Sequence, residues 1–177
     1  MALDIVQKGA SVLREKAVSV IVENIATHSI QDDLKKMHAS LAGQKDGVAL
    51  AAPQIGISKR IFVVAPKAYN DYTNQPLVFI NPVITKRSKN KTWLDEGCLS
   101  VRWIYGTTHR HKQVTVEAYN EHGEKFQHGG SGLVAQIFQH EIDHLDGILF
   151  DDHAKDLGEI TEEEQAEYKK SQDARRE

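Results

Sequence analysis

The sequence lacks the features that mark secreted, membrane-spanning and nucleic-acid-binding proteins. It has one cysteine in 177 residues, which excludes an intrachain disulfide. No apolar run approaches the roughly 18 residues of a membrane-spanning helix. Residues 1–13 carry polar side chains where a secretory signal needs an unbroken apolar core. The net charge of −3 gives no general attraction to nucleic acid. We therefore expect a cytoplasmic protein that binds neither DNA nor a membrane.

The composition is that of one globular domain with a charged end. Apolar residues make up 40% of the chain and charged residues 27%, which are ordinary values for a folded domain. At 177 residues the chain can build one full core and is short for two domains. We assign residues 1–158 to a single domain. Residues 159–177 are expected to form a helical or disordered tail, because few apolar side chains follow the capping box of Thr161 and Glu164.

Hydrophobic periodicity predicts an α+β fold, with mixed short β-strands wrapped around a central α-helix and an additional N-terminal helix. The N-terminal helix is expected to open with Ser29 as its cap and to stop near Gly43. The central helix is expected over 132–146, with Gly147 ending it. Pro82 is expected to separate two strands. The expected strands are 61–65, 77–80, 83–85, 113–119 and 124–127, and the last two form a hairpin.

The most informative motif is the sequence HEIDH at residues 140–144. Residues four apart on a helix share one face, with Cβ atoms about 5 to 6 Å apart, so His140 and His144 suit two neighbouring positions of one metal ion. The single cysteine, Cys98, offers a third ligand, which leaves a fourth position open for water. The plainer alternatives are a helix face with two hydrogen-bonded histidines and a cysteine buried as a small apolar side chain.

The residue beside the first histidine points to hydrolysis. Glu141 is placed to act as general base for water at the open position of the metal. Metalloproteases also use HExxH, but the metzincin pattern needs a further histidine where this chain has Phe150, which excludes that class. Residue spacing alone does not exclude a protease that uses a downstream glutamate as its third metal ligand. The candidates for that ligand are Glu159, Glu162, Glu163 and Glu164.

Three segments together resemble the motifs of peptide deformylases, in that family's order and spacing. They are 47–54 (GVALAAPQ), 96–100 (EGCLS) and 140–144 (HEIDH). The resemblance runs from about residue 13 to residue 150. It implies a metal-dependent amide hydrolase that removes the N-formyl group from the N-terminal formyl-methionine of nascent polypeptides and releases formate.

The resemblance also implies roles for individual residues. The implied metal ligands are Cys98, His140 and His144. Glu141 would be the general acid/base, while Gln54 and the backbone N–H of Leu99 would stabilise the developing oxyanion. The implied substrate-binding residues are Val48, Ala49, Leu94, Leu133 and Ile137, with Gln136 at the pocket wall.

The resemblance further implies a cofactor and partners. The cofactor is one divalent metal ion per chain, with Fe²⁺ as the physiological ion and Zn²⁺ or Ni²⁺ as substitutes, although the ligand set alone also suits zinc. The partners are formyl-methionyl nascent peptides and, transiently, the ribosome. Basic residues of the tail are candidates for a ribosome-facing element: Lys169, Lys170, Arg175 and Arg176.

The chain departs from the family pattern in three places, of which residues 7–10 (QKGA) lack a usual proline. Ala49 stands where a second glycine is usual, and a positive φ there would cost alanine about 1–2 kcal/mol. Residues 102–104 (RWI) follow Val101 where a proline is common. These departures keep a second hypothesis open, a deformylase-like metal-binding protein with altered or lost activity. Beside the metal ligands, Arg110 is expected to pair with Asp143, because their charges are opposite.

Overall fold

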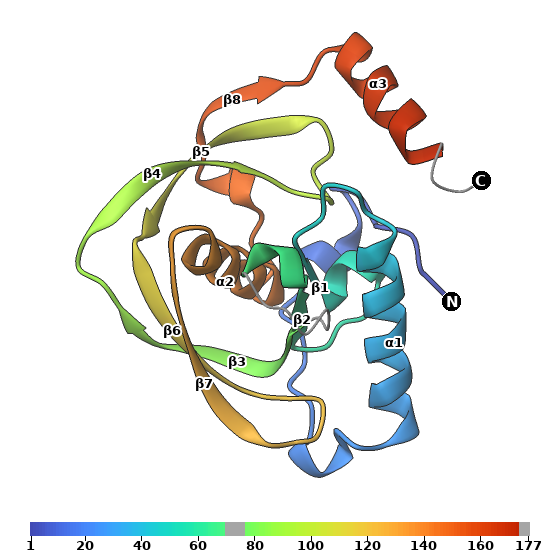
Figure 1. The fold of residues 1–177 in the computed structure, drawn as a ribbon, viewed down its shortest axis with the longest axis vertical. Helices are drawn as coiled ribbons and strands as arrows, with labels where there is room; N and C mark the ends of the chain where they lie inside the picture. The colour runs from blue at the N-terminus through green and yellow to red at the C-terminus, as the bar shows by residue number, and fades with distance from the viewer. Residues whose placement is uncertain (70–76, 174–177) are drawn as a thin grey trace.

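The fold surrounds one helix with two antiparallel sheets (Figure 1). The structure, a computed structural model, describes residues 1–69 and 77–173. In these residues one sheet has five strands in the order β1-β2-β3-β6-β7, and the other has three in the order β4-β5-β8. The first sheet contains β1 (Ala49–Ala51), β2 (Ile61–Val64), β3 (Leu77–Arg87), β6 (Gln113–Tyr119) and β7 (Lys125–Ser131). The second contains β4 (Lys91–Gly97), β5 (Ile104–His111) and β8 (Lys155–Glu159), and the α-helices are α1 (His28–Ala42), α2 (Gly132–Leu145) and α3 (Glu162–Asp173). The predicted α+β class is confirmed.

The central helix α2 is held by apolar packing against the five-stranded sheet. Phe138 of α2 packs on Phe79, with ring centroids 5.0 Å apart, and Phe79 stacks on Phe62 at 4.5 Å. All three rings are fully buried. Gly147 follows the helix with φ of 75°, a left-handed conformation that glycine adopts without strain and that often ends helices. The predicted central helix and its glycine stop are confirmed.

The N-terminal helix α1 covers the other face of the same sheet. Its side chains at helical spacing are all buried: Ile30, Leu34, Met37 and Leu41. The helix ends at Gly43, as predicted, but Ser29 is not its cap. The N–H of Gln31 already donates to the carbonyl of Thr27 at 3.1 Å, so Thr27 is the N-cap and Ser29 lies inside the first turn.

Pro82 does not break the third strand, contrary to expectation. β3 continues through it, with an irregular register between Ile80 and Val83 where it pairs with β6. At this bulge the missing N–H of proline costs no ladder hydrogen bond. Asn81 has a φ of 52° and uses its side-chain amide to bond both backbone groups of Val20, at 2.8 and 2.7 Å.

The second sheet was not predicted, although it carries part of the site. β4 pairs with β5 from Lys91 opposite His111 to Gly97 opposite Tyr105. β8 adds to β5 through Glu159 opposite Ile104, so the first residue of the expected tail belongs to this sheet. The division into a domain 1–158 and a tail stays a prediction.

The tail begins as the capping box predicts. The backbone N–H of Glu164 donates to Oγ1 of Thr161 at 3.3 Å, and a carboxylate oxygen of Glu164 accepts the backbone N–H of Thr161 at 2.9 Å. Helix α3 follows and lies near the C-terminus in Figure 1. Arg175, Arg176 and the side chain of Lys169 lie outside the described residues. No helix in residues 1–69 and 77–173 is long and apolar enough to cross a membrane.

Candidate metal centre and active site

Three side chains from two elements converge on one point. Cys98 follows the end of β4, and His140 and His144 lie one turn apart on α2. The Nε2 atom of His144 lies 3.2 Å from both the Cys98 sulfur and Nε2 of His140. The three donor atoms all lie within 4.8 Å of one another. One thiolate and two imidazoles at this spacing fit a single transition-metal ion, with a coordination position left for water or substrate.

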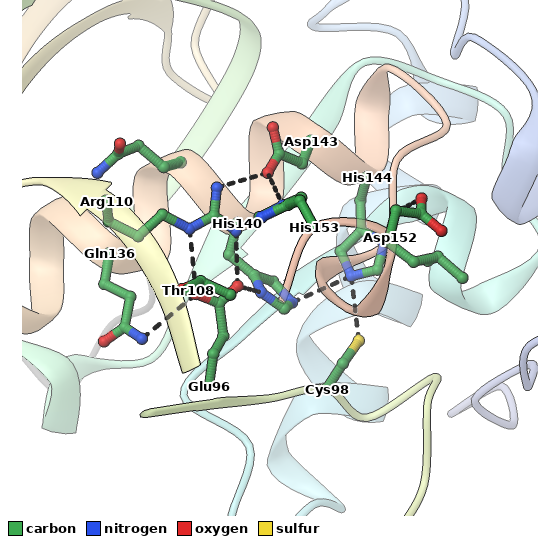
Figure 2. A network of polar contacts seen from close by, with 12 residues as sticks. Glu96, Cys98, Thr108, Arg110, Gln136, His140, Asp143, His144, Asp152 and His153 are labelled. Atoms are coloured by element: carbon green, nitrogen blue, oxygen red, sulfur yellow. Dashed lines mark hydrogen bonds and ion pairs between the residues drawn. The ribbon is translucent and has the colours of Figure 1, made fainter. Parts of the chain in front are cut away.

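The ring of His140 is oriented by a buried carboxylate on β4 (Figure 2). Oε1 of Glu96 lies 2.6 Å from Nδ1 of His140. An Nδ1–H donated to this carboxylate leaves the Nε2 lone pair directed at Cys98 and His144, which is the usual arrangement around a ligating histidine. Glu96 therefore fixes the tautomer that metal binding requires.

Glu96 is itself held by two residues of β5. Arg110 donates to it through Nε at 3.1 Å and Nη2 at 2.6 Å, and the hydroxyl of Thr108 donates at 2.5 Å. Nη1 of Arg110 lies 2.6 Å from a carboxylate oxygen of Asp143 on α2, so the predicted Arg110–Asp143 pair is confirmed. Figure 2 shows Arg110 between the strand and the helix, where it ties the ligand-bearing helix to the second sheet.

The pKa values of these buried groups diverge. Although burial raises the pKa of Glu96, its hydrogen bonds to His140 and Arg110 outweigh burial and hold that pKa well below its usual value. Burial lowers the pKa of His140, but hydrogen bonds to Cys98 and Glu96 reverse this and raise it. Burial and the neighbouring His140 lower the pKa of His144. A histidine must be neutral to bind a metal ion, so the raised pKa of His140 means that metal affinity should increase with pH.

Glu141 has the environment of a general base. It is almost fully buried, lines a cavity, and its Oε2 atom has no hydrogen-bond partner among the described residues. Burial raises the pKa of Glu141 to about 7, with a further contribution from the carboxylates of Glu96 and Asp143. A carboxyl group with a pKa near neutrality can both accept and return a proton during one turnover.

The side-chain amide of Gln54 lies beside the cluster of Cys98, His140 and His144. The side-chain amide of Gln54, which is buried, directs Nε2 towards the Cys98 sulfur at 3.6 Å and the Ser100 hydroxyl at 3.2 Å. Its carbonyl oxygen accepts the backbone N–H of Ala51 at 2.8 Å, which fixes the amide's orientation. Leu99 follows Cys98 directly and also lines the cavity.

A cavity of about 550 Å³ connects these groups to the surface. Most of the expected substrate-binding residues line it: Val48, Ala49, Leu133, Gln136 and Ile137. Leu94 does not line it and instead pairs with Thr108 in the β4–β5 ladder. Ala49 lies in β1 opposite Val64 and has no positive φ, so the backbone strain considered for that position does not arise.

The cavity has a further wall, formed by Trp103, Tyr105, Ile160 and Glu164. The sequence indicated Trp103, because residues 102–104 depart from the family pattern and predict a basic, aromatic rim at the entrance of the cleft. The other three were missed, because only the pairing of β5 with β8 brings them together. None of the downstream glutamates joins the cluster of three donor atoms in the described part of the chain, which removes the basis for a protease with a glutamate ligand.

This arrangement is typical of a metal-dependent hydrolase: two histidines on one helix, a cysteine beside them, a neighbouring carboxylate and a connected cavity. A model of the polypeptide deformylase family matches residues 2–159. The chain therefore belongs to that family, whose members remove the N-formyl group from nascent peptides.

Individual relatives agree with this assignment. The peptide deformylase of Desulfitobacterium hafniense is 45% identical over 153 residues, which cover 85% of this chain and 93% of that protein. The structure of the actinonin-bound class I type b peptide deformylase of Acinetobacter baumannii is similar with a TM-score of 0.79 at 34% identity, covering 88% of this chain and 99% of that chain. The Met-Ala-Ser-bound structure of the same enzyme gives a TM-score of 0.78 at 32% identity, covering 86% and 98%.

Proposed function

We propose that this chain hydrolyses the formamide bond of N-terminal formyl-methionine with Cys98, His140 and His144 as metal ligands. The observation that carries the proposal is the convergence of the three donor atoms within 4.8 Å at a cavity that Glu141 and Gln54 also line. A bound divalent cation would supply Lewis acidity at the carbonyl oxygen and lower the pKa of water. Groups of this protein carry out the proton transfers and stabilise the developing charge.

Glu141 is the proposed proton carrier. Its carboxylate accepts a proton from the attacking water at Oε2, the oxygen that has no partner among the described residues. The protonated carboxyl group then donates that proton to the departing nitrogen, which releases formate and a free amino terminus. The pKa of about 7 suits both transfers, because neither protonation state of Glu141 is strongly favoured near neutral pH.

Gln54 and Leu99 are the proposed donors to the carbonyl oxygen as negative charge develops on it. Nε2 of Gln54 points towards the sulfur of Cys98. Leu99 is the next residue after Cys98 and also lines the cavity. Donors held in place before the reaction stabilise the transition state without reorganisation, and one such donor typically contributes about 10² to 10³ in rate.

The methionine side chain is proposed to enter the apolar part of the cavity, lined by Val48, Leu133 and Ile137. The Ala49 methyl group belongs to the same wall. For the metal, we propose Fe²⁺ as the physiological ion and Zn²⁺ or Ni²⁺ as replacements, since thiolate and imidazole ligands accept all three. The proposed setting is the cytoplasm, with transient contact to the ribosome that presents the nascent chain.

Formate release tests the proposal directly. Protein prepared without oxygen and loaded with Fe²⁺ should release formate from formyl-Met-Ala-Ser, in proportion to the metal content of the same sample. Glu141→Ala should lower kcat by about 10² to 10⁴ while retaining metal and the circular dichroism spectrum. Loaded, folded protein that releases no formate would reject the activity and favour a metal-binding protein without turnover. If Fe²⁺ is the physiological ion, the activity of the protein as isolated should be lost in air, whereas zinc- or nickel-loaded protein should keep its activity.

A further inference from the structure

The cavity wall extends beyond the part of the chain that the family model matches. That match ends at residue 159, whereas Ile160 and Glu164 both line the cavity that contains Glu141 and His140. A substrate peptide bound with its formyl group at the metal ligands must leave through this cavity. Its residues after methionine therefore pass the segment that carries Ile160 and Glu164.

This segment is attached to the rim of the cavity by backbone hydrogen bonds. The N–H of Ile160 donates to the carbonyl oxygen of Trp103 at 2.8 Å, directly after β8 has paired with β5. The side chain of Gln165 donates to the carbonyl oxygen of Ile160 at 2.9 Å. These bonds fix Ile160 beside Trp103, which also lines the cavity.

The carboxylate of Glu164 is oriented by the start of α3. Oε2 of Glu164 accepts both the backbone N–H and the hydroxyl of Thr161, each at 2.9 Å. These hydrogen bonds lower its pKa below the usual value, so the group is ionised at neutral pH. Among the side chains that the structure describes (residues 1–69, 77–167 and 170), no salt bridge involves this carboxylate.

Two other charged residues that line the cavity bond to each other. Arg102 donates to Asp46 through two hydrogen bonds, of 2.7 and 3.2 Å. The negative charge of Glu164 stands on a wall whose other members are aromatic or aliphatic: Trp103, Tyr105 and Ile160.

We propose that Ile160 and Glu164 form an outer subsite that selects formylated peptides with a lysine or arginine downstream of methionine. Such a side chain packs its aliphatic stem on Ile160 and Trp103 while its cation remains hydrated next to Glu164. This inference depends on the proposed function, since it assigns the path of the same substrate.

The test compares two peptides of opposite charge. The kcat/KM of the metal-loaded enzyme should be higher for formyl-Met-Lys-Lys than for formyl-Met-Glu-Glu at low ionic strength. Glu164→Gln should reduce this ratio by about three- to fivefold, the range of an exposed ion pair, because glutamine still serves the capping box and removes only the charge. Glu163→Gln is the matched control, since it removes the neighbouring charge from a residue that does not line the cavity. Ile160→Ala should lower kcat/KM for the lysine peptide more than for formyl-Met-Ala-Ala.

Each other outcome has a defined meaning. Equal kcat/KM values for the two charged peptides would overturn the proposed subsite. If Glu163→Gln changed the ratio as much as Glu164→Gln does, the preference would come from the general negative charge of the helix and not from this subsite. A Glu164→Gln variant that loses activity equally on both peptides would show a structural role only. Calorimetric binding of the same peptides to metal-loaded Glu141→Ala measures the preference without turnover. Absence of formate release from every peptide would then reject the proposed function and leave the subsite to be judged by binding.

Discussion

Nδ1 of His140 lies 2.6 Å from Oε1 of Glu96, and this contact joins helix α2 to the second sheet. Glu96 is almost completely buried, and its other partners, Arg110 and Thr108, come from β5. The carboxylate thus orients the ring of a proposed ligand, and both residues line the cavity. We therefore expect metal affinity and the stability of the second sheet both to depend on this one side chain.

Glu96→Gln should weaken metal binding by about 10- to 100-fold, because glutamine cannot hold the His140 tautomer as a carboxylate does. Competition with a chromophoric chelator measures the change. Asp95→Asn is the matched control, since it removes the neighbouring charge on β4 without a contact to His140. Unchanged affinity in Glu96→Gln would show that the ring is oriented by packing alone.

Glu96 should also dominate the loss of folding stability at low pH. The folded-state pKa of Glu96 is lowered, so its contribution to stability is complete above the unfolded value of about 4.5 and is lost as pH falls through the lowered pKa. The unfolding free energy of the metal-free protein should therefore fall below about pH 5. The Glu96→Gln variant should be less stable at pH 7 by about 3–5 kcal/mol, since Arg110 loses a buried charged partner. Its unfolding free energy should also depend less on pH. Urea denaturation across this range gives both quantities. Parallel pH profiles would contradict the assignment.

Gln54→Ala should reduce kcat by about 10² to 10³ with a smaller change in KM, as expected for a donor that acts mainly in the transition state. It should also cost about 1–3 kcal/mol of stability, because the buried N–H of Ala51 loses its acceptor. Ser100→Ala is the control for the Gln54–Ser100 hydrogen bond. Equal effects of both substitutions on kcat would assign Gln54 a structural role.

Ala49→Gly should destabilise the protein, although glycine is the more usual residue of the family at that position. Ala49 lies in a strand with no positive φ, so glycine gains no conformational relief and costs about 0.5–1 kcal/mol in chain entropy. Thermal unfolding should show a Tm lower by roughly 2–4 °C. A higher Tm would indicate that the alanine methyl group is strained after all.

Local sequence pattern was enough to predict the elements whose buried side chains recur at a regular spacing. The buried side chains of α1 recur at helical spacing, as does the pair of histidines on α2, so both helices were predictable. β4 and β5 were not, because their buried side chains include Glu96, Thr108 and Arg110. These polar groups are stable inside only when they bond to one another, and that requirement is not visible in either strand alone.

The candidate site was also only partly predictable from the sequence. Motif spacing located Cys98, His140 and His144, and the structure brings them together. The wall containing Ile160 depends on β8 joining β5, which is a long-range pairing. Pro82 misled the strand prediction for a related reason, since the bulge that accommodates it is fixed by the distant contact between Asn81 and Val20.

The distribution of the three proposed ligands over two layers has a mechanical consequence. Because Cys98 follows a strand of the second sheet and both histidines belong to α2, a bound ion would act as a cross-link that closes the chain between residues 98 and 140. Such a cross-link raises stability by its binding free energy in the folded state and restricts the separation of the two layers. The ion that activates the substrate would then also govern how often the core opens to proteases.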